Sequence, residues 1–187
     1  MSKNRERIIK SARALFSDKD FEQVTIKEIC ANAGVANSTF YYHFKTKEEL
    51  MDHLSQTDDV PLRAEWIGLA TMTDLLDQVI AACSMCAVRA ERSGYMLTAQ
   101  YYKRRLNVEK EDAVHQSTLD QEQEAAAALI ARAQQQGAVK NMHEAGALAQ
   151  AAIRLTSSAI VDWCVACGGF DLHSEVRRML LLLLTAA

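Results

Sequence analysis

The chain has 187 residues, of which 49% are apolar, and its formal net charge at pH 7 is −3. So large an apolar share excludes an intrinsically disordered chain, and the negative charge argues against a protein that coats nucleic acid regardless of sequence. One proline and seven glycines are too few for a fold of many strands and turns, so we expect an all-α protein.

The first part of the chain contains signals for several short helices. Apolar residues at helical spacing predict a helix over residues 3–17. Thr25 and Glu28 have the spacing of a capping box, in which the hydroxyl accepts from the amide at position 28 and the carboxylate returns to the amide of Thr25. These residues predict a second helix, which ends at Gly34 because glycine adopts the left-handed conformation easily.

A third short helix is expected at about 37–43, directly after this glycine. Thr46 and Glu49 repeat the capping-box spacing and predict the start of a fourth helix. Three short helices with a glycine at the tight turn are typical of a helix-turn-helix. We therefore expect a DNA-binding domain over residues 1–54 and a second helical domain over residues 55–187.

The third helix should have two different faces. Phe40 and Phe44 lie one turn apart and are expected to pack inward. The other positions cannot all share that face, so several must point outward: Asn37, Ser38, Tyr41 and His43. Small polar residues followed by Tyr and His suit a helix that enters the major groove. Tyr42 has an alternative place, partly buried against the first helix. Lys47, in the first turn of the fourth helix, adds a charge beside free amides, as in a phosphate clamp.

Beyond Pro61 the pattern changes to longer helices. The expected helices cover residues 62–92, 94–106, 110–136, 143–167 and 171–185. The last helix is apolar nearly all round, which is unusual for a helix that faces water on one side. Residues 143–187 are therefore expected to form a four-helix interface between two copies of the chain. The alternative is that this apolar surface belongs to the core of a monomer.

Five cysteines, an odd number, and the absence of a secretory signal favour a cytoplasmic protein with free thiols. The longest apolar run, Met179 to Leu184, is too short to span a bilayer, so we expect no membrane association. We predict no metal site and no cofactor. Two i,i+3 cysteine pairs leave open a zinc or redox-sensing site, the other interpretation being simple packing: Cys83 with Cys86, and Cys164 with Cys167.

The stretch TIKEICANAGVANSTFYYHFKTKEEL closely resembles the DNA-binding signature of the TetR family of bacterial transcriptional regulators. The resemblance covers about residues 5–54, and the spacing G-V-x-x-x-T-x-Y-x-x-F-x-x-K-x-x-L within it is specific. It implies a homodimeric repressor that binds a near-palindromic operator in double-stranded DNA and is released by a small-molecule effector bound in a C-terminal domain. The sequence contains no enzyme motif, so we do not expect an enzyme.

The resemblance also implies roles for individual positions. The residues expected to face the groove are Lys27, Asn37, Ser38 and Thr39. Those expected to touch phosphates or bases are Tyr41, Tyr42, His43 and Lys47, and Thr25 is expected both to cap its helix and to contact the DNA backbone. Ala36 stands where many members have a serine cap; if Asn37 were the cap instead, the third helix would start one residue later.

The effector pocket of such proteins lies among the middle helices. The candidates there combine apolar side chains with a few polar groups: Trp66, Met85, Met96, Tyr101, Tyr102 and His115. Because Tyr101 and Tyr102 are adjacent, at most one of them should line the pocket. The alternative function is a metal- or thiol-redox-sensing regulator of the same fold.

Overall fold

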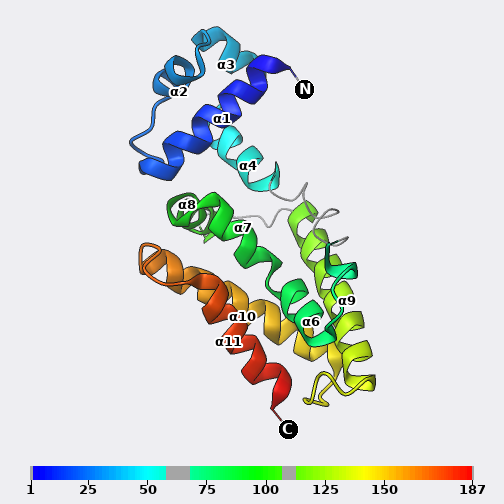
Figure 1. Ribbon diagram of the computed structural model, residues 1–187. Coiled ribbons are helices and arrows are strands. Elements are labelled where there is room, and N and C mark those ends of the chain that lie inside the picture. Colours follow the sequence, from blue (N-terminus) through cyan, green and yellow to red (C-terminus); the bar gives the residue numbers. More distant parts are fainter. Residues whose placement is uncertain (1, 58–67, 107–112, 187) are drawn as a thin grey trace. The chain divides into compact units, whose positions relative to one another are not determined.

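The computed structural model describes residues 2–57, 68–106 and 113–186. All regular elements within these ranges are helices (Figure 1), which confirms the all-α prediction. The described residues form two compact units. The first holds the residues up to 57 together with 93–106, and the second holds residues 68–92 together with 113–186.

The first unit is built around its N-terminal helix. Its helices are α1 (Lys3–Asp18), α2 (Ile26–Ala33), α3 (Asn37–His43), α4 (Lys47–Thr57) and α8 (Tyr95–Leu106). Helix α1 contacts each of the other four. The buried core draws side chains from all of them: Ile8, Phe16, Ile29, Phe40, Leu54 and Leu97. This shared core fixes α2 and α3 relative to α1.

Helix α8 joins this unit although it lies some forty residues further along the chain than α4. Leu97 is only 5% exposed and belongs to the same core as the residues of α1. The side chain of Gln100 donates a hydrogen bond from Nε2 to Oδ1 of Asp20, at 3.3 Å. The core of the helix-turn-helix is therefore completed by a segment from the middle of the sequence.

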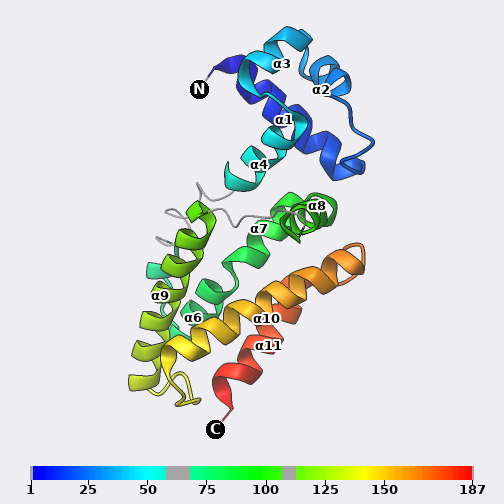
Figure 2. The same ribbon diagram turned by 180° about the vertical axis from the view of Figure 1, so that it is seen from behind.

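The second unit packs its helices around α10. Its helices are α6 (Leu75–Cys83), α7 (Met85–Ser93), α9 (Ala113–Gln135), α10 (Ala145–Val165) and α11 (Leu172–Thr185). Helix α10 contacts α6, α9 and α11, and it runs beside α11 in both views (Figure 2). Thr156 is fully buried on α10, where its hydroxyl lies 3.0 Å from the carbonyl oxygens of both Ala152 and Cys83.

One predicted helix is wrong as a continuous element. In the described part of this range, residues 68–70 are helical, α6 begins only after Asp74, and Ser84 separates α6 from α7. The Asp74 carboxylate accepts from the amide of Asp77 at 2.8 Å, which is an N-terminal cap within the predicted helix. Residues 62–67 lie outside the described ranges. The predictions 94–106, 143–167 and 171–185 are confirmed by α8, α10 and α11.

Candidate nucleic-acid interface

A left-handed glycine forms the turn between α2 and α3. Gly34 has φ 63° and ψ 43°. Its amide donates to the carbonyl of Ala31 at 3.1 Å, and the amide of Val35 donates to the carbonyl of Cys30 at 3.0 Å, so the helix ends in a Schellman motif. A Cβ at this position would lie 2.6 Å from Nη2 of Arg7. Backbone conformation and the approach of α1 therefore both favour glycine here.

Helix α3 begins without a side-chain cap. Ala36 is the N-terminal cap residue, with φ −74° and ψ 153°, and no side chain accepts a hydrogen bond from the first turn. Asn37 is the first helical residue, so the alternative in which Asn37 caps the helix is wrong. The side chain of Asn37 is exposed in the first turn of α3, where it is available for an external partner.

The two predicted faces of α3 are present. Phe40 is fully buried and Phe44 is 2% exposed, with their ring centroids 5.9 Å apart. On the rest of the helix, Tyr41 is 57% exposed and Tyr42 is 83% exposed, so Tyr42 does not pack against α1. The remaining predicted positions divide into exposed Asn37 and Ser38 and half-buried Thr39 and His43. Two buried rings thus hold a helix whose outer surface is polar and aromatic.

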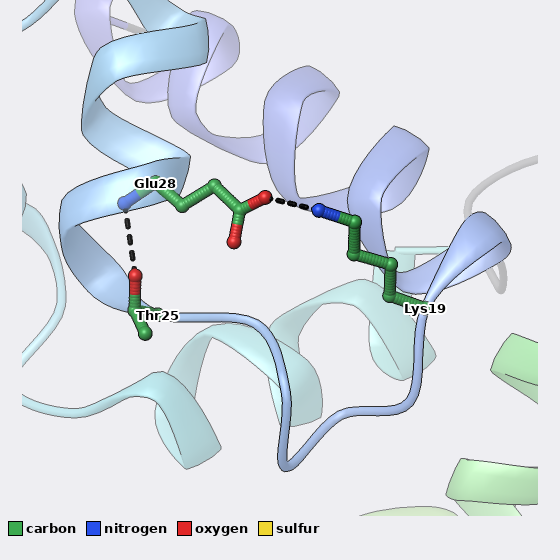
Figure 3. A network of polar contacts seen from close by, with 3 residues as sticks. All are labelled: Lys19, Thr25 and Glu28. Atoms are coloured by element: carbon green, nitrogen blue, oxygen red, sulfur yellow. Dashed lines mark hydrogen bonds and ion pairs between the residues drawn. The ribbon is translucent and has the colours of Figure 1, made fainter.

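The start of α2 combines a cap with an ion pair (Figure 3). Thr25 Oγ1 accepts a hydrogen bond from the amide of Glu28 at 3.1 Å, as the capping box predicts. The Glu28 carboxylate pairs with Nζ of Lys19 at 2.5 Å, and a weaker backbone hydrogen bond with Thr25 also helps to lower the pKa of Glu28. The hydrogen bond from Lys19 lowers the pKa of Glu28 below its ordinary value. Lys27, one residue before Glu28, is exposed.

The start of α4 carries the second predicted capping box, also in modified form. Thr46 Oγ1 accepts from the amide of Glu49 at 3.0 Å. The Glu49 carboxylate accepts from the amide of Lys45 at 2.6 Å, which is one residue before the expected donor. The cap is therefore reciprocal, although it spans one residue more than the capping-box pattern.

Lys47 is half-buried, and its ammonium group points into the first unit. Nζ donates to the carbonyl oxygens of Phe21 at 2.5 Å and Val24 at 2.8 Å. It also lies 4.1 Å from the centroid of the Phe21 ring. The resemblance implies that Lys47 touches DNA, whereas the geometry engages its charge with the loop between α1 and α2.

Two basic residues of α1 near the turn were not among the predicted contacts. The guanidinium of Arg7 donates from Nη2 to the carbonyl of Gly34 at 3.3 Å. Nη2 of Arg5 lies 3.3 Å from Nδ1 of His53, and the guanidinium carbon lies 5.1 Å from the ring centroid of Phe44. Burial and the charge of Arg5 lower the pKa of His53. The run of cations at the start of α1 was visible in the sequence, but its closeness to the turn was not.

The predicted effector residues are divided between the two units. Met85 is buried on α7 in the second unit, and Met96, Tyr101 and Tyr102 are half-buried on α8 in the first. The rings of Tyr101 and Tyr102 meet edge to face, with centroids 5.5 Å apart. Trp66 lies outside the described residues, as does the side chain of His115. The pocket they were predicted to line stays a prediction.

The cysteines are free thiols in different environments. Burial raises the pKa of the Cys83 thiol to about 12 and that of Cys86 to about 11, and it also raises the pKa of Cys164 to about 11. A raised pKa lowers the fraction of thiolate, the form that binds metal and reacts with oxidants. Within the described ranges, no three potential metal-binding side chains lie together.

A half-buried ion pair in the second unit was not predicted. Nη1 and Nη2 of Arg89 on α7 lie 2.9 and 3.3 Å from the two carboxylate oxygens of Glu122 on α9. The side chains are 15% and 13% exposed. The two parallel contacts link α7 to α9. The sequence separates these residues by 33 positions, and no local pattern pairs them.

No helix in the described part of the chain is long and apolar enough to cross a membrane.

Residues 8–54 match the family model for "Bacterial regulatory proteins, tetR family". The uncharacterized HTH-type transcriptional regulator YerO of Bacillus subtilis is 45% identical to this chain over 51 residues. That match spans 27% of this chain and 18% of YerO, so sequence similarity covers under one fifth of that relative.

Solved structures extend the similarity of fold to nearly the whole chain. A protein from Saccharomonospora viridis in complex with choline superposes with a TM-score of 0.78 at 20% identity, over 97% of this chain and 96% of that one. The FadR repressor of Thermus thermophilus in complex with lauroyl-CoA superposes with a TM-score of 0.62 at 21% identity, over 96% and 93%. At such identities the likeness concerns the fold alone.

Proposed function

We propose that this chain, whose residues 8–54 match the model of the TetR family of bacterial regulatory proteins, is a DNA-binding transcriptional repressor. It binds a near-palindromic operator as a homodimer and leaves the operator when a small molecule binds its C-terminal domain. The proposal rests above all on the outer face of α3, which is polar, aromatic and exposed while two buried phenylalanines hold the helix from behind.

The side chains on that face have the chemistry of groove recognition. An exposed asparagine such as Asn37 can form paired hydrogen bonds with adenine, and the methyl group of Thr39 can meet the methyl group of thymine. The hydroxyls of Tyr41 and Tyr42 extend far enough to reach phosphates, which fix the register of a protein on the duplex. In this proposal α3 reads the major groove, Thr25 contacts the DNA backbone, and Lys27, which the resemblance places towards the groove, pairs its exposed ammonium group with a phosphate at the groove edge.

Helices α10 and α11 support the homodimer. The inner stripe of α11 is buried in the second unit, with Leu180 and Leu184 fully covered. Apolar side chains also remain on the outside: Val161 is 41% exposed, Val165 is 79% exposed and Leu182 is 64% exposed. A second copy packed on residues 143–187 would cover them, and it would place two α3 helices on two half-sites.

The proposal of a small-molecule effector is supported by the structural relatives. One structural relative holds choline and another holds lauroyl-CoA, so proteins of this architecture accept small molecules of very different chemistry. An effector releases DNA only if it binds the released conformation more tightly than the bound one. Of the effector residues predicted from the sequence, Met85 lies in the second unit and is the contact proposed there.

The test is operator binding by variants of the outer face. Asn37→Ala should weaken binding to a selected operator by about 1–3 kcal/mol, the value of a good base contact, and Tyr41→Ala by about 1.5–3 kcal/mol, the value of a hydrogen bond to a charged phosphate. Both residues are exposed, so circular dichroism and the unfolding midpoint should stay unchanged. Met142→Ala, a change at a 72% exposed residue of the second unit, is the matched control. Wild-type affinity in both α3 variants would contradict the proposed interface.

A further inference from the structure

The ammonium group of Lys47 is held by the segment that joins α1 to α2. Two of its three N–H groups donate to main-chain oxygens, those of Phe21 and Val24. The Phe21 ring lies over the same group, at 4.1 Å. Hydrogen bonds from a charged donor are stronger than neutral ones, and the face of an aromatic ring also attracts a cation. Turning the ammonium group out towards a phosphate would break these contacts, and a phosphate met without breaking them would have only the third N–H group.

The carbonyls that Lys47 binds belong to residues that determine where α2 begins. Val24 is fully buried and directly precedes Thr25, whose hydroxyl caps α2. Phe21 packs on Phe16 of α1, with ring centroids 5.3 Å apart. One side chain at the start of α4 therefore ties together the end of α1, the connecting loop and the first turn of α2.

We infer that Lys47 is a positioning residue for DNA binding, and that its charge is used inside the protein instead of on the DNA. It holds residues 21–24 so that Thr25 and Lys27 meet the DNA backbone while α3 lies in the groove. This inference rests on the proposed function only for the measurements of DNA binding. The fixing of the loop by Lys47 is a property of the free protein and can be measured without DNA.

A positioning role and a phosphate contact differ in how binding depends on salt. Each phosphate neutralised by a cation releases counterions, and its loss lowers the slope of log affinity against log salt by about 0.9. A positioning residue releases none, so its loss weakens binding at every salt concentration and leaves the slope as it was. Lys27, which is exposed beside the cap of α2, supplies the contrast.

The experiment uses the full chain, a selected operator fragment and salt from about 50 to 200 mM. Lys47→Met should weaken binding about tenfold, the effect expected when one charge-assisted contact that holds the binding conformation is lost. Its salt slope should equal that of the wild type, whereas Lys27→Met should lower the slope by about one. All proteins are measured well below their unfolding midpoints. A slope lowered by about one in Lys47→Met would overturn the inference.

A second pair of measurements covers the case in which Lys47→Met folds poorly. Phe21→Leu leaves the lysine charge in place but removes the ring, so a positioning role predicts weaker DNA binding at an unchanged slope. If Lys47 acts on phosphate, Phe21→Leu should bind like the wild type. In the double variant the two fold-losses should not multiply, because both changes release the same loop. Losses that multiply would contradict a shared action.

Amide hydrogen exchange in the free protein tests the fixing of the loop without any DNA. Lys47→Arg should keep the exchange rates of residues 21–28 close to those of the wild type, since a guanidinium can donate to both carbonyls and stack on Phe21. Lys47→Met should raise them. Unchanged rates in Lys47→Met would refute the positioning role even if the wild type selects no operator, so failure of this inference is distinguishable from failure of the proposed function.

Discussion

Replacing Gly34 by alanine should lower the free energy of unfolding of the first unit by about 1–2 kcal/mol. It should also weaken DNA binding by more than this loss of stability explains. A left-handed conformation costs a non-glycine residue about 1–2 kcal/mol, and alanine recovers about 0.4–1 kcal/mol because it restricts the unfolded chain. The new Cβ would lie 2.6 Å from Nη2 of Arg7. Arg7 is exposed, so moving it costs little more than its 3.3 Å bond to the Gly34 carbonyl, about 0.5–1.5 kcal/mol.

Gly137→Ala is the matched control for this change. Gly137 also has a positive φ, 72°, but a Cβ there would meet nothing within 4 Å. Gly137→Ala should lose only the free energy of unfolding that the left-handed backbone costs an alanine, about 1 kcal/mol or less. Urea denaturation followed by circular dichroism gives the change in free energy of unfolding for Gly34→Ala and for Gly137→Ala. Fluorescence anisotropy with labelled operator gives the DNA affinity of each folded variant.

Arg7→Ala separates the two contributions at Gly34. In that background the steric part of the Gly34→Ala cost should disappear and the backbone part should remain. Weaker operator binding should persist, because the strain lies between α2 and α3. The reasoning is refuted if Gly34→Ala costs no more than Gly137→Ala, or if the Arg7→Ala background leaves its cost unchanged.

Three further results are expected. Arg89→Met leaves the half-buried Glu122 carboxylate without its guanidinium and should cost about 1–3 kcal/mol in urea denaturation, part of it recovered by adding Glu122→Leu; an unchanged free energy of unfolding would contradict a stabilising pair. Cys167 is exposed and should be the first thiol modified in mass-spectrometric labelling of the native chain, whereas uniform labelling would contradict the described burial. The lowered pKa of Glu28 gives stability that is present above the ordinary pKa of a glutamate and is lost as the pH falls through its folded pKa. Lys19→Met should flatten this acid-side loss of thermal stability, and an unchanged pH profile would show that Lys19 is not its cause.

Local signals were sufficient for the helix ends of the first unit. Thr25 caps α2 and Gly34 ends it, both as their spacing predicts. Such signals are reliable because a cap involves only neighbouring residues. The two faces of α3 were predictable for a related reason, since Phe40 and Phe44 lie one turn apart on the same face.

Side-chain partners across the fold were not predictable in this way. The main partner of the Glu28 carboxylate is Lys19 and not the Thr25 amide of the capping box, because the end of α1 brings an ammonium group within reach. Lys47 matches the phosphate-binding position of its motif, yet Phe21 and Val24 take its hydrogen bonds. A motif specifies which residue stands at a position, and only the packing of separate helices decides what that residue meets.

The contribution of α8 to the first unit was hidden for the same reason. Leu97 looks like one apolar residue among many in the second half of the sequence, and nothing near it indicates α1 as its neighbour. The predicted domain boundary after residue 54 was placed where the sequence pattern changes. Packing over such a sequence separation can be seen only in three dimensions.

The central claim, that α3 recognises DNA in a dimer, is tested most directly by selecting genomic fragments with the purified chain. The effector-free protein is incubated with fragments of the genome that encodes it, at near-physiological salt, and the bound fragments are sequenced. We predict enrichment of an inverted repeat whose half-site centres lie about one helical turn, or a multiple of it, apart. A folded protein that enriches no sequence would contradict the claim.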